Sequence, residues 1–139
     1  MPNWCTTVVS VSGKKDKVEA MFERLATQEP TSYSEFSLLE AYLPEPAELS
    51  GNEAANWRGE NWGCNGDIGS DLQKGARGFS FVLRTPWATP TTGLVTISKM
   101  LDVQIVSKWS EPWACIRGHL NVRSGQVLFD REFKTRRWW

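Results

Sequence analysis

Two separate segments have the alternating pattern of a β-strand, and this period constrains the fold of the chain more than any other feature. One face of residues 4–12 carries Cys5, Thr7, Val9 and Val11, and one face of residues 78–85 carries Phe79, Phe81 and Leu83. A two-residue period is typical of a β-strand with one buried side. The chain is therefore expected to build a sheet that other elements cover on one face.

Two further segments have the spacing of amphipathic helices. Residues 14–27 place apolar side chains at Val18, Met21, Phe22 and Leu25, and residues 91–101 place them at Leu94, Ile97, Met100 and Leu101. The remaining expected elements are a strand or extended segment at 36–43, strands at 62–68, 102–109, 113–122 and 125–133, and a short helix at 46–51. Ser124-Gly125 between the last two strands indicates a hairpin turn.

This order of elements predicts one α+β domain over residues 1–139. We expect a ferredoxin-like antiparallel sheet with two helices on one face, an irregular Gly/Trp-rich insert at 45–77, and a C-terminal β-hairpin. A chain of 139 residues can bury a core without a disulfide or a metal ion. No cofactor is therefore expected.

The formal net charge of zero combines two unequal halves. Residues 1–60 carry ten acidic and five basic side chains, whereas residues 61–139 carry six acidic and eleven basic ones. An acidic half suits cationic protein partners and a basic half suits phosphates, although solvated faces on a folded domain would give the same numbers.

Three cysteines, at positions 5, 64 and 115, form no C-x-x-C pair. The sequence shows neither a signal peptide nor an apolar run of the ~20 residues that cross a bilayer. We expect a cytoplasmic protein with free thiols and no membrane association.

Three stretches together resemble a known family. They are Met-Pro-Asn-Trp-Cys-Thr at 1–6, Trp-Arg-Gly-Glu-Asn-Trp-Gly at 57–63, and Thr-Pro-Trp-Ala-Thr-Pro at 85–90. With the P-x-P-x-E-L stretch at 44–49, they make most of the chain similar to the YubB-like ferredoxin-like domain family of phages, prophages and plasmids. The chain departs from the family pattern at Cys64 and Gly66, where a hydroxyl and an aromatic residue are usual, so a pocket there would differ in shape.

The resemblance implies a fold and a mobile-element origin, but no activity. That origin suggests a non-enzymatic protein that covers a surface of a host protein, such as a defence complex, as anti-CRISPR inhibitors do. This is our first expectation for the function.

The central motif is a candidate partner-binding loop. Trp57 and Trp62 offer large rigid contact areas, and Arg58 and Glu60 offer directed charge, which are residue types enriched at binding hot spots. The alternative is that the two tryptophans fill the open end of the core while Glu60 and Asn61 satisfy backbone groups.

The C-terminus is the second candidate, because cations alternate there with rings at Lys134, Arg136, Arg137, Trp138 and Trp139. Such a segment suits single-stranded nucleic acid, and equally an acidic protein groove or an anionic membrane surface. The alternative is that the tryptophans fold back over the sheet. Single-stranded nucleic-acid binding through a basic, tryptophan-rich face and the C-terminus is our second functional expectation. Trp109 and Trp113 lie outside the stretches that carry the family resemblance, so they also need a functional explanation.

Catalytic and metal-binding patterns are incomplete in the sequence. Cys64, His119 and either Glu60 or Asp67 would supply a nucleophile, a base and an orienting carboxylate, but no local signature surrounds Cys64. Asp67 and Asp71 do not have the spacing of an EF-hand loop. Residues 77–84 match an RNA-recognition motif only in part, and Phe79 and Phe81 are expected in the core. We therefore expect neither an enzyme nor a metalloprotein.

Overall fold

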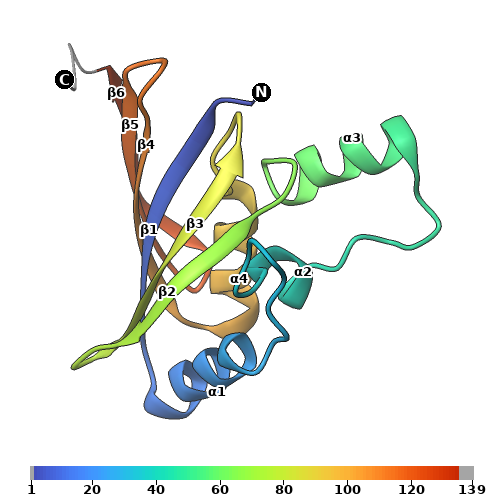
Figure 1. Cartoon of the computed structure of the whole chain (residues 1–139). Coiled ribbons are helices and arrows are strands. Elements are labelled where there is room, and N and C mark those ends of the chain that lie inside the picture. The colour runs from blue at the N-terminus through green and yellow to red at the C-terminus, as the bar shows by residue number, and fades with distance from the viewer. Residues whose placement is uncertain (1, 135–139) are drawn as a thin grey trace.

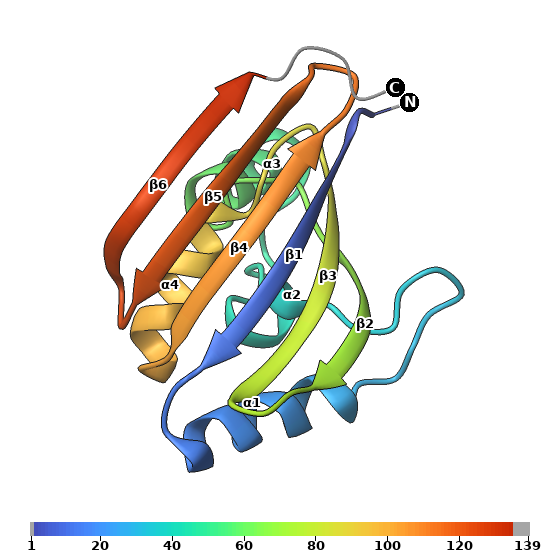
Figure 2. The same cartoon turned by 90° about the vertical axis from the view of Figure 1, so that its left-hand side faces the viewer.

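One six-stranded antiparallel sheet forms the frame of the molecule. The computed structural model describes residues 2–134. The strands are β1 (Trp4–Ser12), β2 (Ile68–Lys74), β3 (Gly78–Pro86), β4 (Gln104–Glu111), β5 (Ile116–Arg123) and β6 (Gln126–Lys134). They lie in the order β2-β3-β1-β4-β5-β6, and every neighbouring pair is antiparallel (Figure 2).

Four helices within residues 2–134 lie on one side of this sheet (Figure 1). They are α1 (Lys15–Ala26), α2 (Leu38–Tyr42), α3 (Gly51–Asn61) and α4 (Thr91–Leu101). Helix α4 lies behind β4 and β5, α1 lies across one end of the sheet, and α3 extends away from it (Figures 1 and 2). The α+β class and the antiparallel sheet are as expected. Residues 2–134 form four helices, where two helices on one face of the sheet and a short one at 46–51 were expected.

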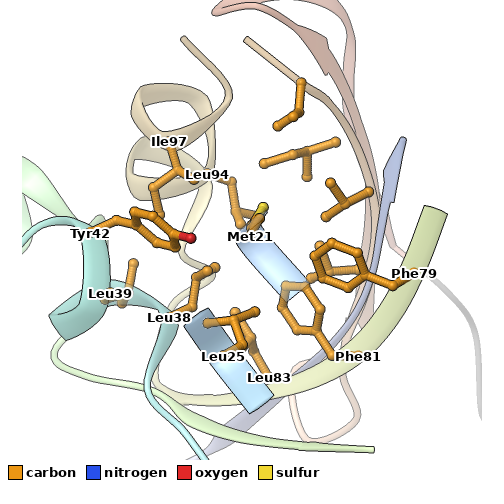
Figure 3. Close-up of a cluster of buried hydrophobic side chains, with 14 of the residues drawn as sticks. Met21, Leu25, Leu38, Leu39, Tyr42, Phe79, Phe81, Leu83, Leu94 and Ile97 are labelled. Carbon is orange, nitrogen blue, oxygen red and sulfur yellow. The ribbon is translucent and has the colours of Figure 1, made fainter. Parts of the chain in front are cut away.

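The core lies between the sheet and the helices (Figure 3). Helix α1 buries Met21 and Leu25, and α4 buries Leu94 and Ile97, as the two apolar stripes predict, but Met100 of the second stripe is 53% exposed. Across from them, β3 supplies its alternating buried residues, and Phe79 and Phe81 lie in the core as expected. Because burial alternates along β1 and β3, each strand turns its other residues to the uncovered face.

The segment expected as a strand at 36–43 is a helix instead. Ser37 caps α2 by accepting the Glu40 N–H, and the Asp67 carboxylate accepts the N–H groups of Leu38 and Leu39 at 2.8 and 3.4 Å. Only Phe36 retains a bridge to the sheet, opposite Gly69. A run of apolar residues fits either structure by pattern, and here the caps decide for the helix.

Two expectations in the 45–77 insert are wrong in position. A helix was expected at 46–51, but α3 begins at Gly51, and the strand expected at 62–68 begins only at Ile68. Ala54 is the one fully buried residue of α3, so the helix has no apolar stripe that a sequence pattern could reveal.

The C-terminal hairpin turns at Ser124 and Gly125, as expected. Both residues have positive φ, 49° and 83°, which is the pattern of a type I′ turn. Strand β5 begins at Ile116, three residues later than expected, because residues 112–115 form a turn. All nine residues of β6 are exposed, since the helices do not extend over this edge strand.

Candidate functional site

Trp62 of the candidate central loop belongs to the core. Its exposed fraction is 2%, and its indole Nε1 donates a hydrogen bond to the Leu43 carbonyl at 2.8 Å. The ring of Trp57 meets it edge to face, with the centroids 5.5 Å apart. Asn61 donates to the Trp57 carbonyl at 2.9 Å. This arrangement agrees with the alternative in which both tryptophans close the end of the core.

The charged residues of the same loop differ from each other in their contacts. Arg58 is half-buried. Its Nη1 donates a hydrogen bond to Glu45 Oε1 at 2.6 Å, which is also an ion pair, and its Nε donates to Asn65 Oδ1 at 2.7 Å. Glu60 is exposed on α3. Arg58 thus ties α3 to the loops on both sides of it, whereas Glu60 is accessible to a partner.

Of the C-terminal candidates, Lys134 ends β6 and is exposed. Arg136, Arg137, Trp138 and Trp139 lie outside the described residues.

The possible catalytic set is not assembled. Cys64 lies in the core, where burial above all raises the pKa of its thiol to about 12. Asp67 accepts the Ser37 hydroxyl at 2.6 Å and caps α2, and burial raises the pKa of its carboxyl. His119 lies on the opposite, uncovered side of the sheet, paired with Lys108 and Arg131 across the strands. These groups therefore cannot act together as nucleophile, base and orienting acid.

Within residues 2–134, no three His, Cys, Asp or Glu side chains are grouped so that they could hold a metal ion. None of the helices in the same part of the chain has the length and apolar composition that spanning a bilayer requires.

The uncovered face of the sheet gathers cations and rings from strands far apart in the sequence. We define the open face by the residues of β1, β3, β4, β5 and β6 that alternate with those of the covered side. This face of the sheet is toward the viewer in Figure 2, with α4 behind it. Its cations are Arg84, Lys108, Arg117, Arg123 and Arg131, all exposed. No Asp or Glu occupies an open-face position of these five strands.

Two of these arginines lie over aromatic rings. The guanidinium of Arg84 is 5.1 Å from the ring centroid of Trp4, and that of Arg117 is 5.5 Å from that of Phe133. The strand register puts both arginines on one row, which runs from Arg84 through Thr6 and Ser110 to Arg117. Each pair presents a positive charge beside an aromatic surface.

His119 lies between two further ring contacts. The centroid of its imidazole ring is 6.2 Å from the ring centroid of Phe129 and 6.4 Å from that of Phe133. Phe129 and Phe133 keep exposed fractions of 43% and 38%. The edge of the sheet at β5 and β6 therefore carries an accessible aromatic surface with cations on both sides of it.

A shallow hollow of ≈ 510 Å³ lies in the middle of the open face. Thr6 and Ser110 are short side chains between the two arginine–ring pairs, so the surface dips there. Lys108, Arg117 and Phe133 also line the hollow. It combines hydroxyl groups, positive charge and a ring.

The other side of β6 carries two carboxylates. Asp130 pairs with buried Leu120 and Glu132 pairs with Gly118, so both carboxylates point to the helix side of the sheet, as does Lys134 opposite Ile116. The sheet thus separates the five cations of its open face from these two carboxylates.

A hollow of ≈ 560 Å³ lies at the other end of the molecule, between α1 and the β2–β3 turn. Glu19 lines this hollow together with Lys15, Lys74 and Arg77, and it lies 4.0 Å from Lys15. The open face is the better candidate site for an anionic ligand, because its five strands place no carboxylate on it.

Sequence reasoning missed the open face. The alternation of Arg117, His119 and Asn121 against Gly118, Leu120 and Val122 in β5 was a signal for it. Its meaning depended on the neighbouring strands, because single cations on β3, β4, β5 and β6 become one surface only in the observed register.

No family model matches the sequence, and no curated protein matches it. Among solved structures, the chain is similar to the crystal structure of the protein api92 from Yersinia pseudotuberculosis, described as DUF1281. The TM-score is 0.69 with 10% sequence identity, over 99% of this chain and 100% of that chain. At this identity the likeness concerns the fold alone.

Proposed function

We propose that this protein binds single-stranded nucleic acid on the open face of its sheet. One observation carries the proposal: five cations and three rings share a face on which the five strands place no carboxylate. Lysine and arginine neutralise phosphates, and this sequence-independent attraction supplies most of the affinity for a polyanion.

The rings favour a single strand over a duplex. Exposed aromatic side chains stack on bases that are not already stacked and paired, at about 1–3 kcal/mol for each base. Phe129 and Phe133 lie on the same strand with Arg131 between them. In β6, rings and positive charge therefore alternate along the strand, as bases and phosphates alternate along a single-stranded nucleic acid.

We also propose that the first four strands form a ferredoxin-like unit. The order β4-β1-β3-β2 and the helices α1 and α4 in the two crossovers support this assignment. Nucleic-acid recognition modules of similar architecture also use the uncovered face of the sheet, which is support by analogy only. Here the rings lie on β6 and on Trp4, not on the buried positions of β3.

The test is fluorescence anisotropy with labelled 12-nucleotide DNA and RNA at several salt concentrations. Five cations predict a slope of log K against log[salt] as steep as about −3.5, at about 0.7 for each phosphate contact. The double variant Lys108→Glu, Arg131→Glu should bind about tenfold more weakly or worse. The control Lys15→Glu, Lys99→Glu carries the same change of net charge on α1 and α4 and should bind nearly as the wild type does.

Equal losses in the two double variants would show that only net charge matters, which contradicts a site on the open face. If the wild type binds neither nucleic acid at low salt, the proposal fails. That outcome would favour our first expectation, a protein of mobile-element origin that covers a host protein. This expectation and the YubB-like resemblance stay predictions.

A further inference from the structure

We propose a second site, for an alkylammonium group such as a lysine side chain, in a hollow on the covered side of the sheet at the ends of β1, β3 and β4. The hollow measures ≈ 310 Å³, near the lower end of the ~300–1,000 Å³ of small-molecule sites. Trp87, Trp109, Glu111 and Glu132 line it, with Cys5 and Asn3. Glu111 lies on the side of the sheet opposite the open-face cations, and Trp109 lines both this hollow and the hollow of the open face.

An unpaired buried carboxylate oxygen is the first observation behind this inference. Glu111 is 5% exposed, and its Oε2 accepts the N–H of Ala114. Its Oε1 is buried without a hydrogen-bond partner among the described residues. Buried carboxylates are normally paired or fully hydrogen-bonded, so an unpaired oxygen in the wall of a hollow indicates a missing cationic partner.

The charged side chains that line the hollow within residues 2–134 are both carboxylates. Glu132 supplies a second carboxylate, and no Lys or Arg lines the hollow within residues 2–134. The thiol of Cys5 reflects this field, because burial and then the Glu111 carboxylate raise its pKa to about 11. The hollow therefore favours a cation over a neutral or anionic ligand.

A strained tryptophan is the second, independent observation. Trp87 has a φ of 67°, a conformation that a bulky residue rarely adopts. Two hydrogen bonds hold the turn: Trp87 N–H donates to the Asn3 carbonyl at 2.7 Å, and Thr85 Oγ1 donates to the Ala88 carbonyl at 2.6 Å. Trp87 is 65% exposed beside the hollow, so burial of its side chain does not offset the cost of this backbone conformation.

These groups suit an ammonium ion on an apolar stem. Indole faces attract cations, and Trp is the best of the aromatic side chains in this role. The carboxylate of Glu111 turns into the hollow to pair with the ammonium, while the methylene stem lies against the rings of Trp87 and Trp109. Cationic side chains of a protein partner would thus be bound on the covered side of the sheet.

The experiment measures binding of Nα-acetyl-lysine methylamide to the full chain by NMR, through the indole N–H signals. The neutral probe of nearly equal size is Nα-acetyl-norleucine methylamide, and n-butylammonium is the free amine. We expect shifts of the Trp87 and Trp109 signals with the lysine derivative and none with the norleucine derivative. Similar affinity for n-butylammonium would mean that the hollow recognises a free amine as well, whereas tighter binding of the lysine derivative would identify a polypeptide ligand.

Two variants with matched controls complete the test. Glu111→Gln keeps the acceptor for Ala114 but removes the charge, and should weaken binding at least tenfold, whereas exposed Glu53→Gln should change nothing. Trp87→Ala should weaken it about fivefold, and Trp113→Ala, which removes a ring outside the hollow, should not. Equal binding of the norleucine derivative, or unchanged binding by Glu111→Gln, overturns the inference.

Discussion

Removing the Trp62 ring should destabilise the fold and leave nucleic-acid binding intact in the molecules that remain folded. Trp62→Ala deletes a side chain that is 98% buried, together with its hydrogen bond to the Leu43 carbonyl and its contact with Trp57. Truncation of a buried Trp costs about 3–5 kcal/mol of the free energy of unfolding, including the cavity that it leaves.

This cost converts into a shift of the melting temperature. Unfolding entropy is about 2.1 cal/mol/K per residue, so 139 residues give about 0.29 kcal/mol/K, and 4 kcal/mol lowers Tm by about 14 °C. Trp62→Phe keeps most of the ring but loses the indole N–H, and should cost about 1–2 kcal/mol. The control Trp113→Ala removes a ring that is 81% exposed and should stay within about 0.5 kcal/mol of the wild type.

Circular dichroism against temperature and urea measures stability, and anisotropy with 12-nucleotide DNA at 15 °C measures binding. The opposite pattern would refute the reasoning. If Trp62→Ala melts within 2 °C of the wild type but loses a partner, the central loop is a recognition element and its ring does not support the core.

Four further outcomes follow from the same structure. Ser110→Phe fills the hollow of the open face and should weaken binding of single strands at least fivefold, whereas Ser80→Phe on the same face should not; anisotropy compares the two. Burial raises the pKa of the Asp67 carboxyl above its value in the unfolded chain, so ionisation of Asp67 destabilises the folded state. As the pH rises from about 4, the free energy of unfolding of the wild type, measured with urea, should therefore fall relative to that of Asp67→Asn. With a pKa of about 12, the Cys64 thiol is about one part in ten thousand ionised at pH 8, so iodoacetamide should label it only after unfolding, as mass spectrometry would show. Deleting residues 135–139 removes two cations and two tryptophans. The slope of log K against log[salt] should become less steep by up to about 1.4, and Tm should stay unchanged. A lower Tm would mean that the two tryptophans close the core.

The strongly patterned elements of the fold could be predicted from the sequence. Strand β1 and helix α4 have the expected bounds. The sequence of β1 alternates, and α4 has an apolar stripe. The helix ends at Asp102, which adopts the left-handed conformation. The stretch at 36–43 could not be decided, since Leu38, Leu39 and Tyr42 fit a strand as well as a helix. The deciding contact comes from Asp67, which lies far along the chain.

Helix α3 shows a different limit. Its sequence, with Gly51 and Gly59, favours a loop, and its hydrogen-bonded form depends on contacts that Trp57 and Arg58 make with other segments. Tertiary contacts override weak local propensity here. The same motif was a candidate site because tryptophan and arginine are enriched both in binding surfaces and in structural contacts.

The open face was hidden for a third reason. Alternation within one strand separates two sets of side chains, but it does not say which cations of other strands will lie beside them. Arg84 and Arg117 are 33 positions apart, and they share a row only because β1 and β4 lie between their strands in the observed register.

The separation of charge across the sheet gives this neutral chain an electric dipole directed through the thickness of the sheet. A polyanion at a distance exerts almost no net pull on it, because opposite charges cancel and salt screens each of them beyond about 8 Å. At close approach, the same field turns the molecule before contact and presents the cationic side first. Orientation, not long-range attraction, would then limit the rate of productive encounters.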